Sequence, residues 1–285
     1  KGLWNVFPIS TTSSEYYLKA DAKTHKTFSI TAAGVSDKVV FSVLLSHHLT
    51  PFDIGFGAKG ILPIKRDAIG EWTAMSLTEI ASSGNATTNV INTILATLGT
   101  GATPQSYFDR FDTDRKKLTK QTWNDGWLVF MGAGGSNVCT AYEPASNFNY
   151  DKTVIDQTLY WAEVETEDEA VYLTGLLNSD SINQVIKEFQ PRGQFGERHV
   201  HKLPLGVTPP FDPGNSAHID VVDKTKQLMA EWGAYKSAHS GIAQDLLNPN
   251  KSRLHIRRKK IKEILVELPS WQDYENSCKA VYCIE

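Results

Sequence analysis

The sequence has few cysteines and no long apolar run, and these absences exclude several classes of protein. Its three cysteines, Cys139, Cys278 and Cys283, are scattered along 285 residues, so we expect neither a disulfide framework nor a metal site. No stretch approaches the ~20 continuous apolar residues that cross a bilayer. The start lacks a secretory signal and an initiator Met. The sequence therefore predicts a cytoplasmic piece of a longer protein, without a membrane partner.

Positive charge is not in excess either. The formal net charge is −3, whereas free-standing nucleic-acid binders usually carry a surplus of Lys and Arg. Hydrophobic residues make up 41% and charged residues 21% of the chain, which is typical of a globular protein. Any nucleic-acid surface must therefore be local, with further cationic contacts supplied by a partner domain.

Motifs for catalysis are incomplete wherever they begin. No P-loop is present, and Gly132-Ala133-Gly134-Gly135 lacks the later acidic strand end of a dinucleotide-binding unit. Thr208-Pro209-Pro210-Phe211 is similar to the catalytic loop of adenine methyltransferases, but Thr stands where the amine-binding Asn or Asp belongs. Asp156 with Glu163-Val164-Glu165 lacks the Lys of a nuclease cluster. We therefore expect no enzyme activity, no catalytic residue and no bound cofactor in this chain.

Hydrophobic periodicity predicts a mixed α+β fold. Strands are expected at Thr27–Ile30, Lys38–Leu45, Ile61–Ile64, Trp72–Ser76, Trp127–Met131 and Thr158–Val164. Helices are expected at Val90–Leu98, Ser106–Gln121, Asp168–Leu177, Ser181–Phe189 and Ala217–Ala238. This order predicts a β-rich part with a helical insertion over residues 1–150. An α/β part over residues 151–285 follows, with a helix pair, a long amphipathic helix and a C-terminal tail, and the two parts can share one core.

A basic, glycine-containing segment follows the helix pair. Arg and Gln can make bidentate contacts with base edges, while Lys and Arg contact phosphates, and glycine allows a close approach to the duplex. The predicted DNA contacts in this segment are Arg192, Gln194, Arg198, His201 and Lys202. The alternative is a solvated loop with ion pairs to Glu188 and Glu197. His199 and His201 lack further nearby ligands, so we expect no metal there.

Two other basic clusters are candidates for phosphate contacts. Lys116 and Lys117 lie on the predicted helix Ser106–Gln121. The stretch Arg253–Lys262 is denser, and its predicted contacts are Arg257, Arg258 and Lys260. A charge run of this kind within an otherwise acidic chain indicates a phosphate contact, although a solvated helix face is the alternative.

Five short motifs, in their order and spacing, resemble a known family. They are Ile155-Asp156-Gln157-Thr158-Leu159-Tyr160-Trp161, Glu167-Asp168-Glu169-Ala170, Tyr172-Leu173 through Leu176-Leu177-Asn178-Ser179, Phe195-Gly196-Glu197-Arg198-His199-Val200-His201-Lys202-Leu203-Pro204, and Pro210-Phe211-Asp212-Pro213. Together they are similar to the C-terminal target-recognition region of large adenine-specific DNA methyltransferases of restriction–modification systems. The resemblance covers residues 151–232, is loose over residues 1–150 and ends near residue 238.

The resemblance implies a specificity domain that binds double-stranded DNA and positions it for a methyltransferase domain absent from this sequence. S-adenosylmethionine would belong to that parent enzyme, which methylates N6 of adenine; whether the parent also cleaves DNA stays open. Recognition contacts would help to offset the unstacking of the target base. The family's catalytic residues lie upstream of this region, so none is carried over, and its base contacts vary with the target.

Two other functions stay open at this point. One is a non-catalytic module that docks subunits of such a complex, and the other is a separate enzyme that uses the Gly132–Gly135 loop. Salt dependence separates the first from a DNA-binding module, because phosphate contacts weaken steeply as salt rises. A thermal shift with S-adenosylmethionine or a nucleotide would support the second.

Overall fold

The chain has a mixed α+β fold, which confirms the predicted fold class. The computed structural model describes residues 35–55, 57–96, 98–112, 116–133, 137–184, 206 and 208–282, and the backbone alone at 4–8, 16–19, 29–30 and 185–189. Tertiary contacts divide the chain into two units. The first unit comprises Lys1–Leu44, Phe56–Trp123 and Phe148–Asp156, and the second comprises Leu45–Gly55, Asn124–Asn147 and Gln157–Glu285. The two units thus alternate along the sequence.

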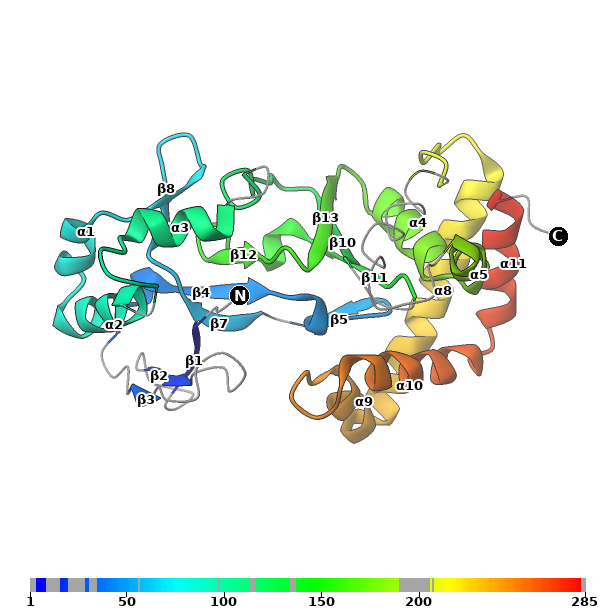
Figure 1. The fold of residues 1–285 in the computed structure, drawn as a ribbon. Helices are drawn as coiled ribbons and strands as arrows, with labels where there is room; N and C mark the ends of the chain where they lie inside the picture. The colour runs from blue at the N-terminus through cyan, green and yellow to red at the C-terminus, as the bar shows by residue number, and fades with distance from the viewer. Residues whose placement is uncertain are drawn as a thin grey trace. The chain divides into compact units, whose positions relative to one another are not determined.

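The first unit is built on a six-stranded sheet (Figure 1). The strand order is β12 (Thr153–Ile155), β4 (Val40–Leu44), β7 (Ala58–Ile61), β1 (Trp4–Pro8), β2 (Tyr16–Lys19) and β3 (Ser29–Ile30). Only the β12–β4 pair is parallel among these strands. The unit also contains a hairpin, β8 (Ile64–Arg66) and β9 (Trp72–Ala74), and the helices α1 (Leu77–Ser82), α2 (Asn85–Ala96) and α3 (Pro104–Asp112). The predicted strand at residues 61–64 is wrong, because Pro63 separates the end of β7 from the start of β8.

The predicted helix over residues 106–121 is also wrong, because α3 ends at Asp112. The Asp112 carboxylate accepts the backbone N–H groups of Leu118 at 2.8 Å and Thr119 at 2.9 Å. Lys116 has φ of +56°, the left-handed conformation, which no α-helix continues through. A side chain that bonds to the following backbone favours a turn over a helix, so residues 116–120 form a turn.

The second unit combines a three-stranded sheet with six helices in its described part (Figure 1). The antiparallel sheet has the order β11 (Thr140–Pro144), β10 (Trp127–Gly132) and β13 (Leu159–Val164), and β5 (Leu49–Thr50) pairs with β6 (Asp53–Ile54). The helices are α4 (Glu167–Asn178), α5 (Asp180–Phe189), α8 (Ser216–Ala238), α9 (Ser240–Leu247), α10 (Leu254–Val266) and α11 (Trp271–Tyr282). The helix pair and the long helix are confirmed. The expected C-terminal tail is instead α11.

The core of the second unit lies where α4, α8 and α11 pack together. A Cβ added to Gly175 would lie 2.2 Å from Oγ1 of Thr225, so only glycine allows α4 to approach α8 this closely. The hydroxyl of Tyr274 on α11 donates to the Gly175 carbonyl oxygen at 2.6 Å. Over the described residues, no helix has the length and apolar character required to span a bilayer.

Candidate nucleic-acid interface

The loop contacts predicted from the sequence fall outside the described residues. Arg192, Gln194, Arg198, His201 and Lys202 all lie between the end of α5 and residue 206. They stay predictions, and the remaining candidates are the two basic clusters.

The first finding in the basic stretch of α10 is that Arg257 is a structural residue. Its side chain has 0% exposure. The guanidinium donates hydrogen bonds to the carbonyl oxygens of Leu246 at 3.2 Å and Leu247 at 3.4 Å, and to that of His47. A buried guanidinium that is bonded to the backbone has no surface to offer a phosphate. The assignment of Arg257 as a phosphate contact is therefore corrected.

Arg258 is half-buried and has a similar role. Its Nε donates to the Leu49 carbonyl oxygen at 3.1 Å, and one terminal nitrogen donates to that of Ser46 at 3.1 Å. Arg257 and Arg258 thus hold the segment before β5 against α10. We likewise remove Arg258 from the phosphate contacts, because its donors are directed toward backbone carbonyls.

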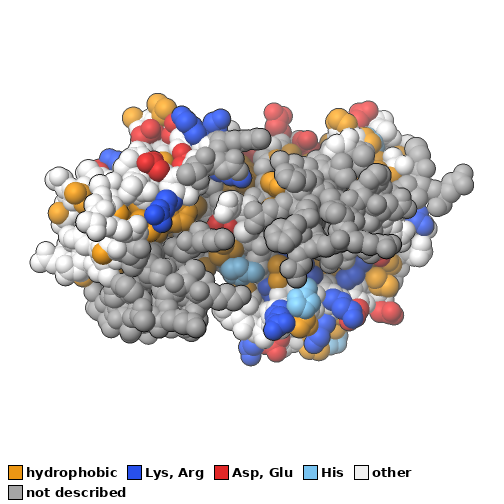
Figure 2. Space-filling model, viewed as in Figure 1, with side chains coloured by type: hydrophobic (Ala, Val, Ile, Leu, Met, Phe, Trp, Pro, Cys, Tyr) orange, Lys and Arg blue, Asp and Glu red, His pale blue; other side chains and the backbone are white. Residues whose placement is uncertain are grey.

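The same helix also presents cations to solvent. Arg253, His255, Lys259 and Lys260 are exposed, and Figure 2 shows Lys, Arg and His side chains gathered over α9 and α10. Lys259 lies 3.7 Å from Glu263, one turn further along the helix. Arg253 occupies the N-cap position of α10 without a side-chain cap, and the first turn contains no acidic residue. We call Arg253, His255, Lys259 and Lys260 the α10 basic face.

The second cluster lies in the first unit. Lys116 and Lys117 are exposed, and so is Lys120 in the same turn. The turn leads directly into Gln121, whose carbonyl oxygen accepts a hydrogen bond of 2.6 Å from Arg66 on β8. The structure therefore places the turn of these lysines next to the loop end of the β8–β9 hairpin, a position that the sequence did not indicate.

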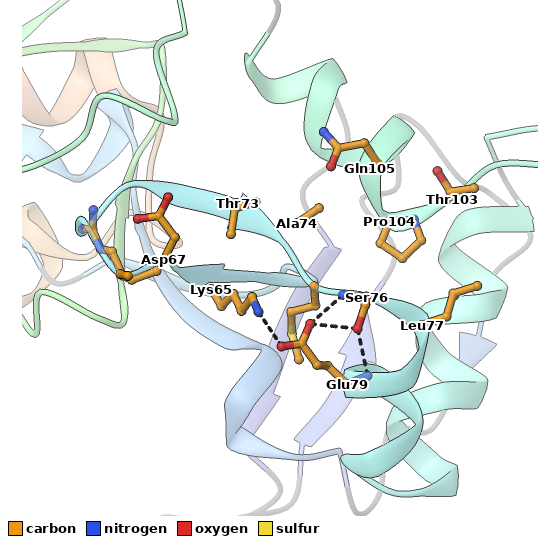
Figure 3. A pocket seen from close by; sticks show the side chains of 13 residues that line it. Lys65, Asp67, Thr73, Ala74, Ser76, Leu77, Glu79, Thr103, Pro104 and Gln105 are labelled. Carbon is orange, nitrogen blue, oxygen red and sulfur yellow. Dashed lines mark hydrogen bonds and ion pairs between the residues drawn. The ribbon is translucent and has the colours of Figure 1, made fainter.

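A cavity of about 710 Å³ opens between the β8–β9 hairpin, the start of α1 and the start of α3 (Figure 3). Lys65 lies 2.5 Å from the Glu79 carboxylate, which also accepts the Ser76 N–H at 2.8 Å. The Lys65 hydrogen bond, followed by those from Ser76, lowers the pKa of Glu79 to about 2. Because Lys65 and Glu79 neutralise one another, this cavity has no strong preference for an anion.

The described residues hold no group of three or more His, Cys, Asp or Glu side chains arranged to bind a metal ion. Glu163, part of the incomplete nuclease motif, accepts the N–H groups of Asn124 at 2.8 Å and Gly126 at 3.1 Å. It therefore orders the chain before β10. Pro209, in the loop that is similar to a methyltransferase motif, accepts a hydrogen bond from the Tyr172 hydroxyl at 3.2 Å.

The buried His48 makes the second unit sensitive to acid. Its Nδ1 accepts the Leu45 N–H at 3.1 Å, which requires a neutral ring at that nitrogen. Burial, with smaller contributions from His47 and Arg257, lowers the pKa of His48 from 6.5 to about 3. The unfolded chain therefore binds a proton more readily than the folded chain, and stability falls as the pH decreases through this window.

We expect this histidine to contribute up to about 1.4 kcal/mol of lost stability for each pH unit below its unfolded pKa. Urea unfolding of the wild type and of His48→Asn, measured across the window from pH 6.5 to about 3, isolates the effect. Asn retains an acceptor for Leu45 but does not titrate, so the variant should show the shallower pH dependence. Equal slopes for the two proteins would contradict the assignment.

Comparison with known proteins comes from structure alone. No protein-family model and no curated protein sequence matches the chain. A solved structure similar to it is that of the Type IIL restriction–modification enzyme MmeI in complex with DNA, with a TM-score of 0.53 and 12% identity. The match covers 100% of this chain and 33% of that one, so this chain spans about a third of the length of the enzyme. The fold is thus similar to a part of a restriction–modification enzyme.

Proposed function

We propose that this chain is the DNA target-recognition part of a restriction–modification adenine methyltransferase. It binds duplex DNA and positions it for a catalytic domain outside this sequence. The likeness to part of an enzyme solved with DNA supports the proposal. The observation that carries it is the α10 basic face, an exposed group of cations on a chain with net charge −3.

The position of these cations favours an anionic partner. Arg253 lies at the N-terminal end of α10, where the helix dipole already carries partial positive charge. A cation at this end is unfavourable without an anion nearby. Lys259 and Lys260 extend the exposed charge by one turn. A phosphate backbone satisfies all of these groups at once, and its contacts dominate the affinity of DNA-binding proteins.

In this proposal the phosphate contacts set the register, and base reading falls to other residues. The residues that we expect to contact bases are Arg192, Gln194 and Arg198, because Arg and Gln can bond to base edges. The DNA backbone contacts are assigned to His201 and Lys202. S-adenosylmethionine belongs to the parent enzyme. Melting curves with and without S-adenosylmethionine should therefore coincide, because only a ligand that binds the folded chain stabilises it.

The double variant Lys259→Ala/Lys260→Ala tests the proposal. We expect weaker duplex binding and a slope of log K against log salt that is smaller by about 2, since each lost phosphate contact removes ~0.9. Fluorescence anisotropy with a labelled duplex at several salt concentrations measures both quantities.

Lys224→Ala/Lys226→Ala on α8 is the matched control. It removes the same charge from another helix, where Lys224 lies 3.9 Å from Asp273 and Lys226 lies 2.6 Å from Asp168. The control should retain the wild-type slope. If both double variants change the slope equally, only net charge matters and the α10 basic face is not the contact surface. If the wild type shows no salt-sensitive binding, DNA recognition itself is excluded.

A subunit-docking module is the second candidate, and one cleft favours it. The cleft has a volume of about 740 Å³ and lies between α8, α9 and α10. Its walls include Leu246, Ile264 and Leu268, and Ile242 beside them is 51% exposed. Failure of the DNA-binding test, together with loss of subunit association in Ile242→Asp, would make docking the leading function.

A further inference from the structure

The tip of the β8–β9 hairpin carries an exposed apolar side chain. Of the large hydrophobic side chains that the structure describes, Ile69 is the most exposed, at 78%. It lies in the loop of residues 67–71 between the two strands, and the hairpin projects from the rest of the first unit (Figure 1). A single exposed isoleucine is ordinary on a protein surface, so its surroundings decide what it does.

The loop that carries Ile69 is held in one conformation. Oδ1 of Asp67 accepts the N–H groups of Ile69 at 3.0 Å and Glu71 at 2.9 Å. The Gly70 N–H bonds to the Asp67 carbonyl oxygen at 3.1 Å, and Gly70 has φ of +82°, which glycine adopts without strain. The apolar tip is therefore ordered before any partner arrives, which reduces the entropy lost on binding.

Arg66 anchors this loop to the unit beneath it. Its guanidinium donates to the carbonyl oxygens of Gly70 at 2.8 Å, Gln121 at 2.6 Å and Tyr150 at 3.0 Å. The same group lies 3.9 Å from the ring centroid of Trp72 and 3.8 Å from that of Tyr150. The arginine thus ties two other segments of the first unit, at Gln121 and Tyr150, to the hairpin and to its loop at Gly70.

Cations lie beside the loop end of the hairpin. The exposed Lys116, Lys117 and Lys120 precede Gln121, which is bonded to Arg66. The loop itself also carries two acids, the exposed Asp67, whose carboxylate accepts two backbone N–H groups, and the half-buried Glu71. A rigid loop with an apolar side chain and lysines at its side fits the major groove of DNA, where thymine methyl groups lie among polar base edges between two rows of phosphates.

We propose that the tip of the β8–β9 hairpin, the loop of residues 67–71, contacts the major groove of duplex DNA, with Ile69 against thymine methyl groups and Lys116 and Lys117 on the flanking phosphates. The strands beneath the loop are packed into the first unit, with Ile64 and Trp72 each 2% exposed, so only the loop reaches the groove, whose thymine methyl groups accept apolar contacts. This inference rests on the proposed DNA binding, and it adds a second contact element, in the first unit, to the α10 basic face.

Apolar and ionic contacts differ in their response to salt, and this difference tests the proposal. The probe is the duplex pool that the wild-type chain retains from a randomised library. Ile69→Ser should bind it roughly tenfold more weakly at every salt concentration, with the wild-type slope. Lys116→Ala/Lys117→Ala should instead lower the slope by about 2.

Leu77→Ser is the matched control, because Leu77 is also an exposed aliphatic residue of the first unit, at 58%, but lies on α1 outside the hairpin. It should bind as the wild type does, and all variants should retain the wild-type melting temperature. If the wild type binds and Ile69→Ser binds equally well, the hairpin is not a DNA contact although the proposed function stands. If the wild type itself binds no duplex, both ideas fail together.

Discussion

Replacing Arg257 with methionine should lower the free energy of unfolding by roughly 3–5 kcal/mol. Methionine fills a similar volume but donates no hydrogen bond. The carbonyl oxygens of Leu246, Leu247 and His47 would then lose the donor that they share in the buried state. Urea unfolding followed by circular dichroism measures the loss.

The control for this variant is Lys260→Met, a substitution on the same helix at an exposed position. It should change the free energy of unfolding by no more than about 0.5 kcal/mol, while it weakens duplex binding. The two positions thus separate stability from recognition. A small stability change in Arg257→Met would show that the buried guanidinium is dispensable and that its structural role is wrong.

Arg66→Lys should destabilise the first unit by roughly 2–4 kcal/mol although the charge is kept. A lysine cannot reach the carbonyls of Gly70, Gln121 and Tyr150 together, and it lacks the planar group that stacks on Trp72 and Tyr150. Urea unfolding gives the global loss. Hydrogen exchange at the amides of the 67–71 loop reports whether the hairpin tip becomes mobile.

Lys65→Ala is the control, since it removes the neighbouring cation on β8. Lys65 forms an exposed ion pair with Glu79, with side-chain exposures of 45% and 38%, and such solvent-screened pairs contribute little to stability. Faster exchange in the loop should therefore be confined to Arg66→Lys. If both variants lower the free energy of unfolding equally, the hydrogen bonds of Arg66 to three carbonyl oxygens do not stabilise the first unit more than an exposed ion pair does.

Elements with a strong local pattern were predictable from the sequence. The long helix α8 buries Val221, Val222 and Leu228 on one face, and β10 buries a continuous apolar run. The end of α3 was not predictable in this way, because it depends on a side chain that bonds to residues several positions later. Helix α11 had a signal that was missed, the spacing of Trp271, Tyr274 and Cys278, all buried.

The candidate site was harder to predict, because adjacent cations have opposite roles. Arg257 and Lys260 lie in one basic run, yet the first is buried and the second is exposed. Arg257 bonds to the carbonyl oxygen of His47, which is 210 residues away in the sequence. One local signal existed, since Arg257 shares the buried face of α10 with Ile261 and Leu265. The hairpin also had a local signal in the sequence, the isoleucine Ile69 within a turn that contains Asp67, Gly70 and Glu71.

The alternation of the two units along the chain has a consequence for synthesis on the ribosome. The segment Leu45–Gly55 belongs to the second unit. The carbonyl oxygen of His47 in this segment accepts a hydrogen bond from Arg257, which is synthesised 210 residues later. At about 5–20 residues per second, that interval lasts roughly 10–40 s. The first unit can close once Asp156 has emerged. During this interval the first unit can be folded while the segment Leu45–Gly55 still lacks its contacts in the second unit. We therefore expect this segment to be accessible to chaperones.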